Sequence, residues 1–306
     1  MSKRKVTDIA ASVRARLLTY SKQTGRPFQE VLQYFAMERF LYRLSRSKHA
    51  DKFVLKGGLM LTAWNAPHSR PTKDIDFLAR ISNDIDVVAN EVRDVCAVVE
   101  LSDGLSFEPE SIEAVVIKED ADYEGVRVTF LGHLQNARIH MQIDVGFGDV
   151  VIPEPVQMTY PTMLDHDAPQ IHGYPRETTI AEKFEAMVKL GLLNSRIRDF
   201  FDIWMLSRQF DFEGPTLSNA IAQTFTNRDT AIESMPVAFQ PEFATDDGKQ
   251  AQWKGFCRKS RIDFAPESLE EVGQSISGFL SPIAEAIVNG KQFDQFWNAP
   301  GPWRNR

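Results

Sequence analysis

The chain has 306 residues, of which 43% are hydrophobic, and a formal net charge of −7, so it can bury a substantial core in one or two domains. No apolar run approaches the ~20 residues that a membrane-spanning helix needs, and the start MSKRK lacks a following apolar signal core, so we expect a cytoplasmic protein with no membrane partner. The two cysteines, Cys96 and Cys257, lie far apart in no CxxC pattern, which argues against a disulfide framework or a zinc site.

Charge is distributed unevenly along the chain. Between Met1 and Ala50 there are eleven Lys/Arg and three acids, which leaves the remainder of the chain at −15. Such a basic segment can bind RNA locally, and it can equally be a solvated helical surface. On the RNA interpretation, Arg39, Arg43 and Arg46 belong to the basic face. Arg43 also has a second interpretation, a buried structural ion pair.

Two helices are predicted in this basic segment. Asp8 can cap the first, whose apolar residues recur at four-residue spacing: Ile9, Val13 and Leu17. The sequence Gly25-Arg26-Pro27 then breaks the chain, and its proline is well placed to start a second helix from about Phe28 to Ser45. We interpret the large apolar side chains of the second helix as core residues: Val31, Leu32, Phe35, Phe40, Leu41 and Leu44.

A glycine turn follows the second helix. A short apolar run begins at Phe53 and ends before Lys56, and the chain turns at Gly57 and Gly58 before an apolar segment, Leu59 to Trp64, that is predicted as one helix. Paired glycines let backbone N–H groups approach a phosphate closely, and a helix after them offers its N-terminus to the anion. The alternative for a lone Gly-Gly pair is an ordinary turn.

The chain then reaches the acidic sequence Asp74-Ile75-Asp76-Phe77. Because side chains alternate along a β-strand, both aspartates share one face while Ile75 and Phe77 face a core. Neighbouring carboxylates repel each other, so a fold holds such a pair most readily around a cation. Mg²⁺, or Mn²⁺, takes oxygen ligands and is commonly held by one or two carboxylates plus substrate phosphates. The alternative for a lone DxD pair is a solvated strand edge.

The glycine pair followed by the two aspartates resembles the hG[GS]…DhDh signature of the polymerase-β-type nucleotidyltransferase superfamily. Fifteen residues separate Gly58 from Asp74, more than is usual in that superfamily, so we expect a longer loop, NAPHSRPTK, that carries Arg70 and Lys73 toward the site. The preceding text, FAMERFLYRLSRSKHADKFVLKGG, is similar to a narrower group. It resembles the AbiEii/MenT family of nucleotidyltransferase-like toxins from bacterial toxin–antitoxin and phage-defence systems.

A helix is predicted from Asn83 to Glu100, followed by strands at Ala114 to Lys118, Gly125 to Leu131 and Arg138 to Phe147. The third of these strands alternates apolar and polar residues, which places Asp144 on a polar face. Asp144 is therefore a candidate to complete a triad with the two aspartates, as the third carboxylate does in the superfamily, and the text IDVGFGD also resembles the toxin family. The alternative is that this aspartate merely caps a strand edge.

The segment from Val151 to Pro175 holds five prolines without sustained periodicity, and we interpret it as a linker or lid between two lobes. Thr178 or Thr179 then opens a helix. Glu182 follows Thr179 at the spacing of a capping box, and Gly191 is expected to end the helix.

A second cluster of charges lies in TTIAEKFEAMVKLGLLNSRIRDFFDIWML. On a helix beginning near Asn194, residues three or four apart are neighbours on the surface. Ordinary helix salt bridges explain such charges in most proteins, and Asp202 is expected to pair with Arg198 in a structural role.

Three residues of this segment match the toxin family's pattern of a lysine in an E-K segment followed by an arginine- and aspartate-containing helix. The resemblance implies that Lys183 contacts triphosphate oxygens. It implies that Arg196 does the same or orients Asp199, and that Asp199 is a catalytic or nucleotide-positioning acid.

Beyond Phe210 the sequence shows no further motif that indicates a function. Leu217 to Phe225 and Leu269 to Val288 are predicted as helices, and Pro236 to Gly248 as a loop. The resemblance covers about Phe28 to Leu206, and the last hundred residues carry no recognisable motif.

We therefore expect an α/β fold: a nucleotidyltransferase-type mixed sheet with flanking helices in an N-terminal lobe, residues 1–170, and a mainly helical C-terminal lobe, residues 171–306, that completes the NTP pocket. The expected catalytic residues are Asp74, Asp76, Asp144, Lys183 and Asp199, of which the first three are also the expected metal ligands. The expected nucleotide-binding residues are Lys56, Gly57, Gly58, Arg70, Lys73, Lys183 and Arg196.

The resemblance implies transfer of a nucleoside monophosphate from an NTP to an acceptor hydroxyl. In the toxins that the chain resembles the acceptor is tRNA, whose modified 3′ end can no longer be charged with an amino acid, and a cognate antitoxin is encoded nearby. An antibiotic-modifying enzyme, a protein-modifying nucleotidyltransferase and a non-catalytic nucleotide-binding protein remain alternatives. An aminoglycoside acceptor would favour an acidic cleft, whereas tRNA would favour the basic N-terminal face.

Overall fold

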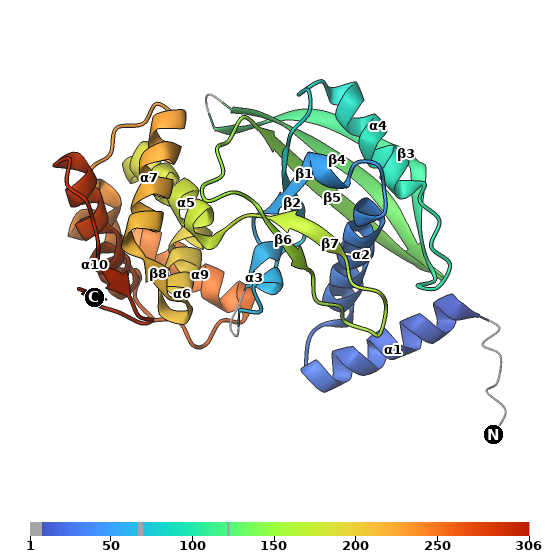
Figure 1. The fold of residues 1–306 in the computed structure, drawn as a ribbon. Helices are drawn as coiled ribbons and strands as arrows, with labels where there is room; N and C mark the ends of the chain where they lie inside the picture. The colour runs from blue at the N-terminus through green and yellow to red at the C-terminus, as the bar shows by residue number, and fades with distance from the viewer. Residues whose placement is uncertain (1–7, 67–69, 121–122, 306) are drawn as a thin grey trace. The chain divides into compact units, whose positions relative to one another are not determined.

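The computed structural model describes residues 8–66, 70–120 and 123–305, which form two compact units (Figure 1). Unit 1 consists of Met1–Asn65, Thr72–Gly148 and Val156–Gly173. Unit 2 consists of Ala66–Pro71, Asp149–Pro155 and Tyr174–Arg306. No helix among the described residues is long and apolar enough to cross a membrane.

Unit 1 is built on a mixed sheet, which confirms the expected α/β class. Within the described residues it has seven strands in the order β3-β4-β5-β2-β1-β7-β6. The pairs β2–β5 and β1–β7 are parallel, and the other neighbours are antiparallel. The strands are β1 (Phe53–Lys56), β2 (Ile75–Ala79), β3 (Leu105–Asp120), β4 (Tyr123–Leu134), β5 (Ala137–Phe147), β6 (Val156–Thr159) and β7 (Gln170–Gly173).

The segment after Val151, which its prolines predict to be a linker or lid, instead contains two strands. Strands β6 and β7 lie within it, and β7 pairs in parallel with β1 through Val54 opposite His172 and Leu55 opposite Gly173. Each strand has only four residues. A strand so short shows little alternation in sequence, and its conformation here depends on pairing with a distant strand.

Helices cover the sheet of unit 1: α1 (Ile9–Thr24), α2 (Phe28–Ser45), the 3₁₀ turn η1 (Ala50–Lys52), α3 (Leu59–Ala63) and α4 (Ile85–Cys96). The predicted cap of α1 is confirmed, because Oδ1 of Asp8 accepts a hydrogen bond from the Ala11 backbone N–H at 2.8 Å. The bounds of α2 are those predicted from its apolar pattern.

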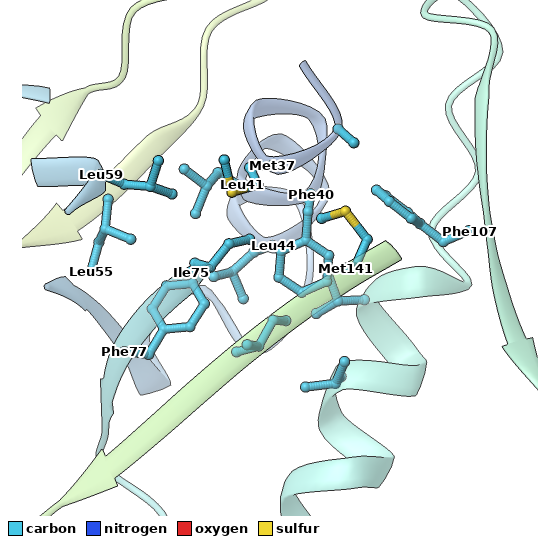
Figure 2. Packing of buried hydrophobic residues seen from close by; sticks show 14 of the residues in the cluster. Met37, Phe40, Leu41, Leu44, Leu55, Leu59, Ile75, Phe77, Phe107 and Met141 are labelled. Atoms are coloured by element: carbon cyan, nitrogen blue, oxygen red, sulfur yellow. The ribbon is translucent and has the colours of Figure 1, made fainter. Parts of the chain in front are cut away.

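Helix α2 lies against the sheet and supplies much of the core. Figure 2 shows Phe40 and Leu44 of this helix among side chains from β2, β3 and β5. The ring of Phe40 lies 5.8 Å from that of Phe107 and 5.6 Å from that of Phe130, centroid to centroid. Burying a phenylalanine of this kind contributes roughly 1.5–3 kcal/mol, so the packing of Phe40 helps to hold α2 against the sheet that carries β2 and β5.

Two arginines of α2 are core residues, which contradicts their assignment to a basic face. Arg43 is 2% exposed and donates to both carboxylate oxygens of Asp103, at 2.8 and 3.1 Å. Arg39 is 1% exposed and donates to the Asp167 carbonyl at 2.8 Å. A buried guanidinium needs such partners, and the second interpretation of Arg43, a buried structural ion pair, is confirmed. Arg46 is exposed at the end of the helix.

Unit 2 is mainly helical, as expected. Its helices are α5 (Arg176–Leu190), η2 (Gly191–Leu193), α6 (Ile197–Gln209), α7 (Gly214–Asn227), η3 (Val237–Phe239), α8 (Pro241–Ala244), α9 (Asp247–Ser260) and α10 (Leu269–Val288). A small sheet joins β8 (Phe212–Glu213), β9 (Phe296–Trp297) and β10 (Trp303–Arg304). The bounds of α10 are those predicted, whereas α8 and η3 occupy the predicted loop after Pro236, and α9 was not predicted.

The start of α5 differs from the predicted capping box. The helix begins at Arg176, and the Thr178 hydroxyl instead donates to the Ile152 carbonyl at 2.7 Å and accepts from the Ile152 N–H at 3.0 Å. The end of the helix is as predicted, because Gly191 is its C-cap with a φ of 48°.

Candidate active site

Parallel pairing of β2 with β5 brings three aspartates together in unit 1. Asp76 lies opposite Asp144 in this register, and Asp74 immediately precedes β2. One carboxylate oxygen from each of these residues lies within 4.8 Å of the others. Ile75, between Asp74 and Asp76, is 0% exposed, and Phe77, which follows Asp76, is 2% exposed. Strand alternation therefore places the aspartates on the polar face because the intervening side chains are required in the core.

Asp74 is also held by the residues just before it. The Thr72 hydroxyl donates a short hydrogen bond to Oδ1 of Asp74. The Thr72 backbone N–H in turn donates to the Tyr34 hydroxyl of α2 at 2.9 Å. The core helix thus fixes the loop that delivers the first carboxylate.

Gly57 lies directly against the second carboxylate. Lys56 is paired with Asp76 across β1 and β2, and Gly57 follows with a φ of 68°. A Cβ atom at Gly57 would overlap the carboxylate of Asp76. Glycine is required here both by the backbone conformation and by this close approach. Gly58 precedes α3, but a helix of five residues carries little macrodipole, so the expected helix N-terminus is a weak anion site.

Arg127 of β4 is a site residue that the sequence interpretation missed. Its Nε and Nη2 atoms donate to the two oxygens of Asp144, each at 2.8 Å. The hydrogen bond to Asp144, against the effect of burial, raises the pKa of Arg127. A sequence signal was present, since a lone arginine between the core residues Val126 and Val128 faces away from the core.

Registers across four strands place four charged residues in one row, with a cation at each end and two carboxylates between them. Lys56 lies opposite Asp76, Asp76 opposite Asp144, and Asp144 opposite Arg127. The Gln142 side-chain amide adds a donor at 3.1 Å from Oδ2 of Asp144.

The donor set of the triad fits a divalent cation. All of its ligand atoms are carboxylate oxygens, which Mg²⁺ and Mn²⁺ prefer, and three carboxylates in one place favour a cation even with the Arg127 guanidinium bound to Asp144. Arg127 occupies one lone pair on each oxygen of Asp144, and a carboxylate has further lone pairs for a metal.

A second charged cluster lies entirely in unit 2. The Nζ atom of Lys183, on α5, lies 2.5 Å from Oδ1 of Asp199 and 2.9 Å from Oδ2 of Asp202, both on α6. Arg70 donates through Nε and Nη2 to the two oxygens of Asp202, each at 2.8 Å. Asp202 is 2% exposed and Arg70 is 7% exposed.

Burial and pairing act in opposite directions on the pKa values of this cluster. Burial alone would lower the pKa of Lys183, but the charges of Asp199 and Asp202 outweigh it and raise that pKa above its ordinary value. Burial alone would raise the pKa of Asp202, but Arg70 and Lys183 hold it below its ordinary value. Both directions favour the charged forms of Lys183 and Asp202.

The expected partner of Asp202 was wrong, whereas the nucleotide-binding role of Arg70 stays a prediction. Asp202 does not pair with Arg198, which is exposed, but with Lys183 and with Arg70, 132 residues away in the chain. Arg70 is thus committed to a buried ion pair. Sequence spacing suggested the i−4 neighbour because a contact between distant segments leaves no local periodicity.

Lys73 and Arg196 are the other charged residues that the sequence predicts to bind the nucleotide. Lys73 is exposed, and its carbonyl accepts from the Gln33 side chain at 3.3 Å. Residues 67–69 of the predicted loop lie outside the described residues. Arg196 precedes α6, where its backbone N–H donates to the Asn194 side chain at 2.7 Å.

Two solved structures from Helicobacter pylori are similar to this chain. One, described as "Crystal structure of putative nucleotidyltransferase from H. pylori", has a TM-score of 0.46 and 13% identity, covering 87% of this chain and 99% of its own. The other, of the protein JHP933, has a TM-score of 0.45 and 13% identity, covering 86% of this chain and 93% of its own. No curated protein matches the chain.

The model of one protein family also matches this sequence. The family is described as nucleotidyl transferase AbiEii toxin, type IV toxin–antitoxin system, and the match extends over residues 39–275. It therefore includes the glycine turn, the three aspartates, Arg127 and the lysine cluster of unit 2. The chain belongs to the AbiEii family of nucleotidyltransferase toxins of type IV toxin–antitoxin systems.

Proposed function

We propose that this toxin transfers a nucleoside monophosphate from an NTP to a hydroxyl at the 3′ end of tRNA. The carboxylate triad, with its three oxygens within 4.8 Å on one face of the sheet, is the observation that carries the proposal. In the reaction the acceptor oxygen forms a bond to the α-phosphorus. The bond from that phosphorus to the β-bridging oxygen breaks, pyrophosphate leaves, and the acceptor proton passes to a carboxylate of the triad.

Asp74, Asp76 and Asp144 would hold the divalent metal in this proposal. When bound, Mg²⁺ or Mn²⁺ supplies Lewis-acid polarisation of the phosphate and of the acceptor oxygen. The protein orients its ligands beforehand, because Thr72 holds Asp74 and Arg127 holds Asp144. The close approach of Gly57 to Asp76 leaves backbone, rather than a side chain, beside the second carboxylate.

Lys183 is assigned to the phosphates of the nucleotide. Its raised pKa keeps it cationic, and Asp199 and Asp202 fix the position of its ammonium group. A fixed cation stabilises the charge that develops on a leaving pyrophosphate without having to reorganise. In this assignment Asp199 positions Lys183, and Asp202 anchors the cluster through Arg70.

The tRNA acceptor is proposed from the resemblance of FAMERFLYRLSRSKHADKFVLKGG and the downstream motifs to toxins that modify tRNA. Adding a nucleotide to the 3′ end would remove the hydroxyl that receives an amino acid and so block translation. Because Arg39 and Arg43 are buried, these two arginines do not contribute to the RNA-binding surface that the sequence had indicated, whereas Arg46 is exposed. The type IV toxin–antitoxin family implies an antitoxin partner as well.

The test is incubation of the purified protein with Mg²⁺, total tRNA and each of the four NTPs labelled at the α-phosphate. We expect label on the 3′ end of tRNA with at least one NTP, and none with Asp76→Asn. Pyrophosphate release without labelled tRNA would contradict the RNA acceptor and favour a protein or a small alcohol as the acceptor. Nucleotide binding with no turnover under any condition would overturn the enzymatic proposal.

A further inference from the structure

Helix α9 of unit 2 carries an exposed row of cations. Lys254 and Arg258 lie one turn apart, and Arg261, the C-cap residue, continues the row at the next turn. All three side chains are exposed. Within the described part of the chain they have no ion pair or hydrogen bond. The opposite side of α9 is fixed in the core by Trp253, which is 0% exposed and donates from Nε1 to the Pro266 carbonyl at 2.9 Å.

A partly exposed aromatic ring lies beside the end of this row. Phe264 is 37% exposed and stacks on Trp204 of α6 with 6.4 Å between ring centroids. The guanidinium of Arg208, also exposed, lies 5.8 Å from the centroid of the same tryptophan. Exposed cations next to an aromatic face are the features with which proteins bind RNA phosphates and stack bases.

Helix stability alone does not account for this surface. Cations in the last turn of a helix interact favourably with the macrodipole, which explains Arg258 and Lys259. Lys254 lies a turn earlier, beyond most of that effect. The partial exposure of Phe264 has no stabilising role of this kind.

We propose that the α9 surface, defined as Lys254, Arg258, Arg261 and Phe264, binds the phosphate backbone of the acceptor RNA and stacks one of its bases. The inference rests on the proposed function, which supplies an RNA acceptor. Because the whole chain has a net charge of −7, RNA must bind through a local basic patch. The row on α9 provides one that does not depend on the buried arginines of α2.

The experiment compares binding of fluorescently labelled total tRNA by wild type and by the triple variant Lys254→Gln, Arg258→Gln, Arg261→Asn. Asparagine is chosen at position 261 because that residue has a φ of 54°, which asparagine tolerates well. Anisotropy is measured with Mg²⁺ and without NTP across a series of salt concentrations. The control variant, Arg80→Gln, Lys291→Gln, Arg304→Gln, removes the same charge from other exposed positions.

The triple variant should bind tRNA on the order of tenfold to a hundredfold more weakly at about 0.15 M salt, with a log–log salt slope shallower by about two to three. Phe264→Leu should keep the salt slope and lose about fivefold or more in affinity. The control variant should bind like wild type. Thermal melting confirms that each variant is folded.

Wild-type affinity and salt slope in the folded triple variant would overturn the α9 surface and leave the proposed transfer to tRNA standing. Absence of tRNA binding by the wild type would overturn both. Poly-glutamate of matched charge separates RNA from an acidic peptide, because an oriented phosphate and base site should prefer tRNA. Equal binding of the two polymers, lost together in the triple variant, would overturn the RNA assignment in favour of an acidic protein partner.

Discussion

Arg127 is the residue whose role the geometry defines most sharply. Its guanidinium lies against both oxygens of Asp144, so it neutralises one carboxylate of the triad and fixes its orientation. These two effects oppose each other in metal binding. The positive charge repels a divalent cation, whereas the orientation of Asp144 helps to bind one.

We expect the positive charge of Arg127 to determine the affinity for the metal, and the orientation of Asp144 to determine the rate of nucleotidyl transfer. Arg127→Gln should therefore bind Mn²⁺ severalfold, up to about tenfold, more tightly in the absence of NTP. Its nucleotidyl transfer should fall by about tenfold to a hundredfold because Asp144 is no longer held. Calorimetry measures the first quantity and label transfer the second. Arg138→Gln, an exposed arginine on β5, is the matched control. Weaker Mn²⁺ binding by Arg127→Gln would contradict the first expectation, because the orientation of Asp144 would then determine metal affinity as well as the transfer rate.

Lys183 has a structural and a proposed functional role that one variant cannot separate. Lys183→Met leaves the carboxylate of Asp199 without its cation, and removing one member of a buried ion pair costs on the order of 3 kcal/mol. The double variant Lys183→Met/Asp199→Asn removes the charge pair together and should recover most of that stability.

The double variant should nevertheless bind NTP at least tenfold more weakly than wild type in calorimetry with Mg²⁺. Asp199→Asn alone serves as the comparison, because it keeps the lysine. Undiminished NTP affinity in a folded double variant would leave Lys183 with a structural role only.

At the scale of elements, α2 carries a titratable group that couples pH to the stability of unit 1. Burial raises the pKa of Glu38 to about 7, opposed by the charge of Arg39. Its Oε2 atom accepts from the Met163 backbone N–H at 2.7 Å, which fixes the segment between β6 and β7 against α2. In the unfolded chain a glutamate has a pKa of about 4.3.

The native state therefore binds this proton more tightly than the unfolded state, and its contribution to stability is lost as pH rises from about 4 through 7. In the wild type, titration of Glu38 should lower the free energy of unfolding by a few kcal/mol, to order of magnitude, between about pH 5 and pH 8. Glu38→Gln should not show this decrease. Urea unfolding at pH 5, 6, 7 and 8 measures it. Glu30→Gln, on the same helix and paired with Arg26 at the surface, should keep the wild-type profile. Identical profiles for wild type and Glu38→Gln would contradict the account.

Elements whose stability is local were predictable from sequence. The bounds of α2 and α10 followed from apolar residues at helical spacing, and the aspartates on β2 and β5 from alternation. The strands β6 and β7 were not, because four-residue strands depend on pairing with β1. Helix α9 was missed because most of its residues are polar or exposed and its apolar stripe is weak.

In the candidate site, too, local features were predictable from the sequence, whereas contacts between distant segments were not. Asp74 and Asp76 are neighbours in sequence, so their shared face was predictable. The Arg127–Asp144 and Arg70–Asp202 pairs join segments 17 and 132 residues apart. Their formation depends on strand order and on packing between distant segments, which single-sequence periodicity does not encode.

At the scale of the whole molecule, we assign nucleotidyl transfer to a chain that contains a carboxylate triad in one unit and a paired lysine cluster in the other. The two units need not share their stability. Asp76→Asn removes one of three neighbouring negative charges, so we expect its melting temperature to equal or exceed that of wild type, since like charges repel. A variant that lost activity by unfolding would instead melt at lower temperature.

Nucleotidyl transfer is tested most directly by the fate of each phosphate of the NTP. With Mg²⁺ and tRNA, wild-type protein is given the same NTP labelled at the α-phosphate or, separately, at the γ-phosphate. We expect that only the α-label joins the acceptor, that the γ-label leaves in pyrophosphate, and that both events are lost in folded Asp76→Asn. Transfer of the γ-label to the acceptor, or undiminished α-transfer by Asp76→Asn, would contradict this expectation.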